Sequence, residues 1–324
     1  MADVVRASRG RVTNPDAHRL YLLARHLADR WTRENLSKAI EYLKQALDRS
    51  PDFALAWVEL SRACAVEGAQ GWVPEEEAYQ RAREAVEHAL ALEPDLPEGH
   101  AQVAWIRTVQ WDWRGAEASF ARALELAPGN AFVLRWCGGF AQLMGRFDQA
   151  VDLCRRAMEQ DPLSAPACHN YGFALQAANR LADAKEAYRR ALELAPQKAI
   201  THENLALVLL AQGLRDEALA EAEREPEEWA RLFAVTIVQH DKGDQPSSDA
   251  AFRELVEKHA ADSSKQIAEV HALRGDLDAA FDWLERSYAQ RDGALCEIKT
   301  SLYLRLLHED PRWGAFVRKM GFDG

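Results

Sequence analysis

Cysteine and histidine side chains are the groups in this 324-residue sequence best able to act as nucleophiles, bases or metal ligands. The five cysteines form no Cys-x-x-Cys pair and show no zinc spacing, and the histidines include no His-Glu-x-x-His. Cys168 and His169 are adjacent, but adjacent residues of a helix point about 100° apart, so they do not form a nucleophile–base pair. Glycine-rich phosphate loops are also missing from the sequence. We therefore expect a protein that is not an enzyme and that holds no metal or cofactor.

Composition narrows the class of partner. The formal net charge is −11. A protein this acidic is not expected to bind nucleic acids or anionic membranes through general electrostatic attraction. The sequence does not open on a secretory signal, and no apolar run reaches about 18 residues, so no membrane insertion and a cytoplasmic location are expected. Hydrophobic residues make up 48% of the chain, which is enough for a sizeable core.

Small residues and prolines recur every 34 residues in the middle of the chain. Three sets keep this spacing: Ala116, Ala150 and Ala184; Ala123, Ala157 and Ala191; Pro128, Pro162 and Pro196. The two alanine positions are seven residues apart, hence on one helical face, where a neighbouring helix approaches too closely for a large side chain. The prolines end the second helix of each unit. Gly145 and Gly213 both fall at position 15 of the 34-residue unit, in the turn between its two helices. The pattern predicts a tandem array of helical hairpins.

A 34-residue unit of two helices closely resembles the tetratricopeptide repeat. The resemblance implies an all-α, right-handed superhelical solenoid of about eight hairpins with a C-terminal capping helix. We expect a loose tail over 1–13, repeats one to six over 14–225, degenerate hairpins seven and eight over 226–292, and a cap over 293–324. Hairpin seven is expected to contain a polar loop over 241–249.

The second repeat departs from the period. Ala39 and Ala82 occupy equivalent positions but are 43 residues apart, so nine extra residues lie between the two helices, at about 68–77. They are expected to lengthen the hairpin and its second helix. Such an insertion serves either as a binding feature or as a tolerated surface loop.

A narrower resemblance covers roughly residues 14–323. It rests on Asn14-Pro15, the lengthened second repeat, Trp111-Asp112-Trp113 and the closing Asp310-Pro311-Arg312-Trp313. Together these are similar to the C-terminal repeat module of bacterial class III adenylate cyclases and winged-helix transcriptional regulators. The chain is then either a free-standing relative or the repeat part of a longer regulator.

The tetratricopeptide resemblance also implies a binding groove, lined by the first helix of each hairpin. The inward positions of this pattern are Arg62, Trp105, Arg135, Gln142, His169, Asn170, Phe173, Gln176, Glu203 and Asn204. Asn170 and Asn204 occupy the same position of successive repeats. Since an asparagine amide offers a donor and an acceptor, such a ladder can hold the backbone of an extended peptide. The alternative is that these asparagines bond within the helical array.

The expected function is a non-catalytic adaptor that binds a protein or peptide in this groove. Arg62 and Arg135 give the groove positive charge, which suggests a partner with acidic character, and Trp105 and Phe173 would supply apolar contacts. The alternative is a regulatory module of a cyclase or transcription factor that acts through self-association or a bound signal.

Overall fold

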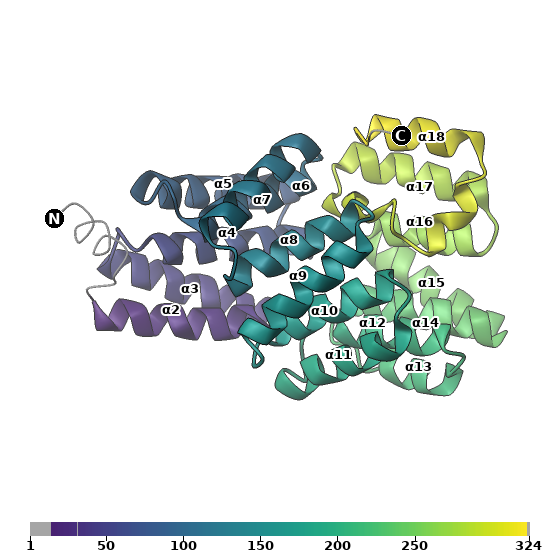
Figure 1. The fold of residues 1–324 in the computed structure, drawn as a ribbon. Coiled ribbons are helices and arrows are strands. Elements are labelled where there is room, and N and C mark those ends of the chain that lie inside the picture. Colours follow the sequence, from purple (N-terminus) through teal and green to yellow (C-terminus); the bar gives the residue numbers. More distant parts are fainter. Residues whose placement is uncertain (1–13, 31, 323–324) are drawn as a thin grey trace. The chain divides into compact units, whose positions relative to one another are not determined.

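The computed structural model describes residues 14–30 and 32–322, and all regular secondary structure in this part of the chain is helical. The helices form eight successive hairpins followed by a C-terminal segment (Figure 1). The first four hairpins are α2 (Pro15–Ala28) with α3 (Arg33–Arg49), α4 (Ala54–Ala69) with α5 (Glu75–Leu92), α6 (Pro97–Val109) with α7 (Trp113–Leu126), and α8 (Ala131–Leu143) with α9 (Phe147–Gln160). The other four are α10 (Ala165–Ala177) with α11 (Leu181–Leu194), α12 (Thr201–Ala211) with α13 (Arg215–Ala222), α14 (Glu228–Lys242) with α15 (Gln245–His259), and α16 (Ser264–Leu273) with α17 (Leu277–Gln290). The all-α architecture of helical hairpins is confirmed; the tail over 1–13 lies outside the described residues.

The chain divides into two compact units. Of the described residues, the first unit comprises those up to Thr108 together with Arg114–Cys137, and the second comprises Val109–Trp113 and those from Gly138 onwards. The division falls within the regular repeats.

Alanines of the repeat form the closest helix contacts. Those at the two small positions of the second helix are all completely buried: Ala39, Ala46, Ala82, Ala89, Ala116, Ala123, Ala150, Ala157, Ala184 and Ala191. Complete burial at every one of these positions supports the predicted register. The five cysteines are also buried, and each is a free thiol.

The turn inside a hairpin requires left-handed backbone. At position 15 the φ angles of Gly145, Gly213 and Gly275 are 74°, 77° and 79°. Trp111 and Asn179 occupy the same position with φ of 65° and 58°. A bulky residue rarely adopts this conformation, because its Cβ crowds the backbone. The turn geometry is therefore imposed by the hairpin even where the sequence supplies no glycine.

The extra residues of the second repeat extend both of its helices. α4 has 16 residues and α5 has 18, whereas α10 and α11 of a regular repeat have 13 and 14. Only a short turn remains between Ala69 and Glu75.

The polar stretch over 241–249 is mostly helical, so the expected loop there is wrong. α14 continues to Lys242 and α15 begins at Gln245. Gly243 closes α14 with φ of 79°, and the Asp244 side chain accepts a hydrogen bond from the backbone N–H of Ser247 at 3.2 Å. An adjacent C-terminal glycine and N-terminal cap allow one helix to follow another almost directly.

The C-terminal segment covers the last hairpin of the second unit. It contains the 3₁₀ helices η1 (Gly293–Glu297) and η2 (Tyr303–Leu307), followed by α18 (Pro311–Lys319). Within this unit the Trp113 indole Nε1–H donates to the carbonyl of Met320 at 2.8 Å, and the Trp113 ring stacks on Phe322 with centroids 4.1 Å apart. Trp111 stacks on Tyr288 of α17 at 5.1 Å. The tryptophans singled out in the sequence thus help to fix the end of the chain.

None of the helices in residues 14–30 and 32–322 combines the length and the hydrophobicity needed to cross a lipid bilayer.

Candidate functional site

Arg62, the first of the predicted groove residues, is engaged inside the first unit. Its side chain is buried on α4, where Nε donates to Glu59 Oε2 at 2.7 Å and an Nη atom lies 3.3 Å from Asp29 Oδ1. A buried arginine held by two carboxylates already has its charge compensated. Arg62 therefore offers little positive charge to a ligand.

Arg135 and Trp105 belong to an aromatic cluster of the first unit. The Arg135 guanidinium lies 4.7 Å from the Trp136 ring centroid and 5.5 Å from that of Phe132. Trp105 packs on Trp136 with ring centroids 4.5 Å apart. Arg135 is buried and Trp105 is partly exposed. Stacking on aromatic rings stabilises a cation, so this arginine also has an internal role.

Helix α10, the first helix of its hairpin in the second unit, carries four of the predicted residues. His169 is buried, and its Nδ1 lies 3.0 Å from Thr201 Oγ1. Gln176 accepts a 2.7 Å hydrogen bond from the Tyr188 hydroxyl. Asn170 and Phe173 are half-buried, and the Asn170 amide makes no hydrogen bond with the described part of the chain. Asn170 and Phe173 lie one turn apart on the same face, so they can contact one ligand together.

The next inner helix, α12, carries Glu203 and Asn204. The Asn204 Nδ2 donates to the carbonyl of Ile200 at 2.6 Å, so its donor is used within its own repeat. The predicted asparagine ladder is therefore unequal: Asn170 has its amide available, whereas Asn204 retains only its acceptor. Gln142, on α8, is buried.

Glu225 fixes the start of α12, a role that sequence reasoning missed. Its carboxylate accepts hydrogen bonds from three backbone N–H groups, those of Ile200 at 3.0 Å, Glu203 at 3.2 Å and Glu227 at 3.1 Å. The first two would otherwise be unpaired donors at the beginning of a helix. Burial nevertheless raises the pKa of Glu225. The sequence carries no local signal for this contact, because Glu225 lies more than 20 residues after the helix start that it caps.

Acidic and basic side chains meet in the second unit between α16 and the segment that follows α17. Lys265 of α16 lies 3.2 Å from Glu269 Oε1 and donates to Glu297 Oε2 at 2.8 Å. Glu269 also accepts a 2.6 Å hydrogen bond from the Ser301 hydroxyl. Glu203 of α12 lies near enough to this group for its carboxyl to interact electrostatically with Lys265, Glu269 and Glu297. We refer to Glu203, Lys265, Glu269 and Glu297 as the Glu203 cluster.

Burial shapes the protonation of the cluster. Glu203 and Glu269 are 7% and 3% exposed. Burial, followed by the charge of Glu225, raises the pKa of Glu203 well above its ordinary value. The pKa of Lys265 is raised by Glu269 and Glu297, which outweigh burial. Lys265 therefore remains charged, whereas Glu203 is driven towards its neutral form.

Two members of this cluster fall at inward positions of the repeat pattern when that pattern is continued through the eighth repeat. Gly275 at position 15 places the start of that repeat at residue 261. Lys265 and Glu269 then occupy positions 5 and 9, both inward. Glu297 follows the last hairpin and has no position in the repeat, so only the fold reveals it.

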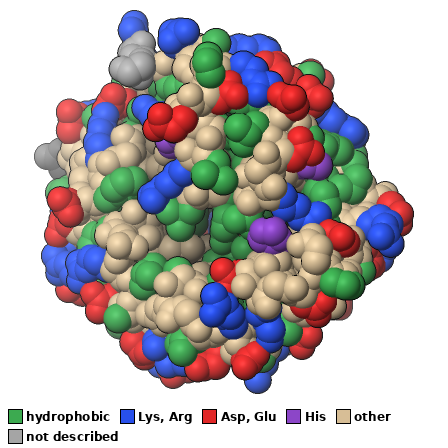
Figure 2. Space-filling model, turned by 90° about the vertical axis from the view of Figure 1, so that its right-hand side faces the viewer, with side chains coloured by type: hydrophobic (Ala, Val, Ile, Leu, Met, Phe, Trp, Pro, Cys, Tyr) green, Lys and Arg blue, Asp and Glu red, His purple; other side chains and the backbone are tan. Residues whose placement is uncertain are grey.

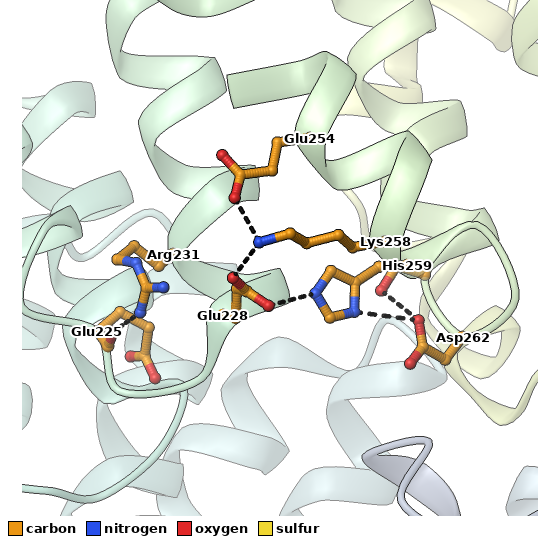
Figure 3. A network of polar contacts seen from close by, with 8 residues as sticks. Glu225, Glu228, Arg231, Glu254, Lys258, His259 and Asp262 are labelled. Carbon is orange, nitrogen blue, oxygen red and sulfur yellow. Dashed lines mark hydrogen bonds and ion pairs between the residues drawn. The ribbon is translucent and has the colours of Figure 1, made fainter. Parts of the chain in front are cut away.

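Other charged groups of the second unit are paired among themselves. Between α14 and α15, Lys258 Nζ donates to Glu228 Oε1 at 2.7 Å and to Glu254 Oε1 at 2.6 Å (Figure 3). His259 lies between Glu228 and Asp262, with nitrogen–oxygen distances of 3.3 Å and 3.5 Å. The hydrogen bond from Lys258 lowers the pKa of Glu228. These contacts join α14 to α15.

No group of three or more His, Cys, Asp or Glu side chains within residues 14–30 and 32–322 is arranged to hold a metal ion.

Basic, acidic and hydrophobic side chains are mixed on the face of the molecule shown in Figure 2.

Family models for the tetratricopeptide repeat match residues 21–71, 173–230 and 241–294, and a further model of the same description matches 141–200. Among curated proteins, the transcriptional regulator HilA of Salmonella typhimurium is 22% identical over 152 residues, which is 47% of this chain and 28% of HilA. Small glutamine-rich tetratricopeptide repeat-containing protein 2 of Mycosarcoma maydis is 29% identical over 96 residues, covering 29% of this chain and 27% of that protein. The chain thus spans less than a third of the length of these relatives.

Solved structures support the same fold at low identity. The human IFIT1 dimer with m7Gppp-AAAA aligns over 80% of this chain and 68% of its own, with a TM-score of 0.58 and 16% identity. A tetratricopeptide repeat protein from Parabacteroides merdae aligns over 83% of this chain and all of its own, with a TM-score of 0.50 and 15% identity. The matched models cover more than half of the chain, and we conclude that this protein belongs to the tetratricopeptide repeat family.

Proposed function

We propose that this protein is a non-catalytic adaptor that binds an extended segment of a protein partner on the inner face of its second unit. The observation that carries the proposal is on α10: the half-buried Asn170 amide makes no hydrogen bond with the described residues and lies one turn from the half-buried Phe173. An amide with a free donor and acceptor can pair with a peptide backbone, while an adjacent aromatic ring supplies apolar contact. We place this binding activity in the cytoplasm.

An acidic partner has less support. That expectation rested on Arg62 and Arg135, and the structure gives both side chains internal neighbours: Glu59 and Asp29 for Arg62, and aromatic rings for Arg135. We therefore centre the site on His169, Asn170, Phe173, Gln176, Glu203 and Asn204.

The test is a selection from a random dodecapeptide phage library on the purified chain, followed by fluorescence polarisation with the selected peptides. Asn170→Ala combined with Phe173→Ala should weaken binding at least tenfold, because both the backbone contact and the aromatic contact are removed. Arg189→Ala is the matched control, because Arg189 is exposed on the outer helix α11 and pairs with Glu186 three residues away. Failure to select any peptide, or equal affinity for the folded double variant, would reject the proposal.

A second candidate is a regulatory module. The match to HilA over 152 residues favours it, together with the resemblance to the repeat modules of cyclases and winged-helix regulators. Such a module would change its self-association when a signal binds. Light scattering coupled to gel filtration, with and without a selected peptide, separates the candidates: a change in mass supports regulation, and a constant mass supports the simple adaptor.

A further inference from the structure

The Glu203 cluster contains three carboxyl groups and a single ammonium group. Lys265 supplies one ammonium group, and that group is shared between Glu269 and Glu297. Glu203 is a third carboxyl facing the same lysine. Glu225, whose charge also acts on Glu203, is held by three backbone N–H groups.

Glu203 itself lacks a partner. Its side chain is more than nine-tenths buried, yet its carboxyl makes no hydrogen bond or ion pair with the described residues. Buried carboxylates are normally paired or hydrogen-bonded, because an uncompensated charge in the interior is costly. The contrast with Glu228, whose carboxylate contacts both Lys258 and His259, shows that this unit does pair its acids elsewhere.

Glu297 is the member of the cluster that lies open to solvent. The Glu297 side chain is 36% exposed, and Glu203 lies on α12, in the helix that follows the hairpin carrying Asn170 and Phe173. A chain bound along the first helices of successive hairpins would meet α10 and then α12.

A metal ion does not fit this cluster, because no three acidic, histidine or cysteine side chains of the described residues are suitably placed to bind one. An organic cation needs less: a guanidinium or ammonium group is held by hydrogen bonds to one or two carboxylates. Such groups are provided by arginine and lysine side chains.

We propose that the Glu203 cluster is a specificity site that receives one basic side chain, arginine or lysine, of the peptide bound on the inner face of the second unit. The incoming cation favours the ionised form of Glu203, which releases its proton to solvent and accepts the hydrogen bonds of the cation, while Glu297 contributes at the exposed side. The inference rests on the proposed peptide-binding function and adds the chemistry of the partner.

The experiment uses position-scanning nonapeptide arrays, in which one position at a time is fixed as each of the 20 amino acids and the others are mixed. The full chain should select arginine or lysine at one position. Glu203→Gln should reduce that preference about tenfold, because a charge-assisted hydrogen bond becomes a neutral one. The substitution keeps the size of the side chain and removes no hydrogen bond seen in the structure. Glu217→Gln, on the exposed face of α13, should leave the preference intact.

The outcomes separate the two proposals. Arrays that bind the chain without a basic preference, or a Glu203→Gln variant that keeps it, would overturn the specificity site and leave the peptide groove standing. Arrays that bind nothing would reject both. Glu203→Asp adds a check on charge: a partial return of the basic preference relative to Glu203→Gln is expected, and preferences identical to those of Glu203→Gln would contradict the assignment.

Discussion

Glu203 shows what a single residue reveals once its neighbours are known. Its repeat position placed it on the inner face from the sequence alone. Its chemistry is set first by burial and by Glu225, which follows the next helix, and then by Lys265, Glu269 and Glu297, which lie more than 60 positions away. The same limit applies to Arg62: the register predicts that it faces inward, but not that Asp29 and Glu59 compensate its charge. The sequence therefore predicts the repeat position of such a residue, but not the residues that it contacts.

The raised pKa of Glu203 has a consequence for stability. Below the ordinary pKa of a glutamate, both folded and unfolded chains are protonated at this residue. As the pH rises above that value, the unfolded chain ionises freely while the folded chain retains its proton, so Glu203 lowers the free energy of unfolding until the pH passes the raised pKa. Glu203→Gln should remove this loss.

We expect Glu203→Gln and the wild type to have similar stability at pH 4, and the variant to be the more stable at pH 8. Urea denaturation followed by circular dichroism at both pH values measures the difference. Glu217→Gln again serves as the control and should track the wild type at both. A Glu203→Gln variant that is less stable at pH 8 would mean that the carboxylate is paired in the free protein.

At the scale of the elements, the repeat pattern predicted most of the fold. Alanine and proline spacing gave the hairpins, because helices that pack this closely tolerate only small side chains at the contacts. The sequence-based prediction was wrong at 241–249: the polar composition indicated a loop, but the structure has two helices there that are separated only by Gly243 and Asp244. It also could not reveal that Glu225 caps α12 from beyond the following helix, since that contact depends on tertiary structure.

The packing of α8 on α9 offers a test of the register with neighbouring glycines. A Cβ atom on Gly138 would lie 2.4 Å from the sulfur of Cys154 and 3.3 Å from the carbonyl of Ala150, whereas one on Gly139 would meet nothing within 4 Å. Gly138→Ala should therefore destabilise the protein by about 1–3 kcal/mol through overpacking. Gly139→Ala should stabilise it by about 0.5–1 kcal/mol, because alanine favours the helix more than glycine does.

Thermal and urea unfolding of the two variants provide the comparison. Both substitutions add one methyl group to the same helix, so a difference of opposite sign isolates the contact with α9. Equal effects for the two would show that the small position of the repeat is not where the structure places it.

For the whole molecule, the repeat architecture predicts that a local defect stays local. In stacked hairpins each repeat contacts chiefly its neighbours, so stability is approximately a sum of repeat and nearest-neighbour terms. Leu255 of α15 is completely buried among Leu232, Ile237 and Ile267, and Leu43 of α3 is completely buried in the first unit. Truncating either Leu255 or Leu43 to alanine removes a similar amount of apolar contact and should lower the free energy of unfolding by about 2–5 kcal/mol.

Leu255→Ala should reduce amide hydrogen-exchange protection in α14–α17 and leave α2–α5 unchanged, because opening spreads only to adjacent hairpins. Leu43→Ala should give the reverse pattern. Mass spectrometry of peptic fragments measures both in one experiment. If either substitution lowered protection evenly along the chain, the hairpins would unfold as one cooperative body, and a ligand bound near Glu203 would then stabilise every repeat rather than those beside it.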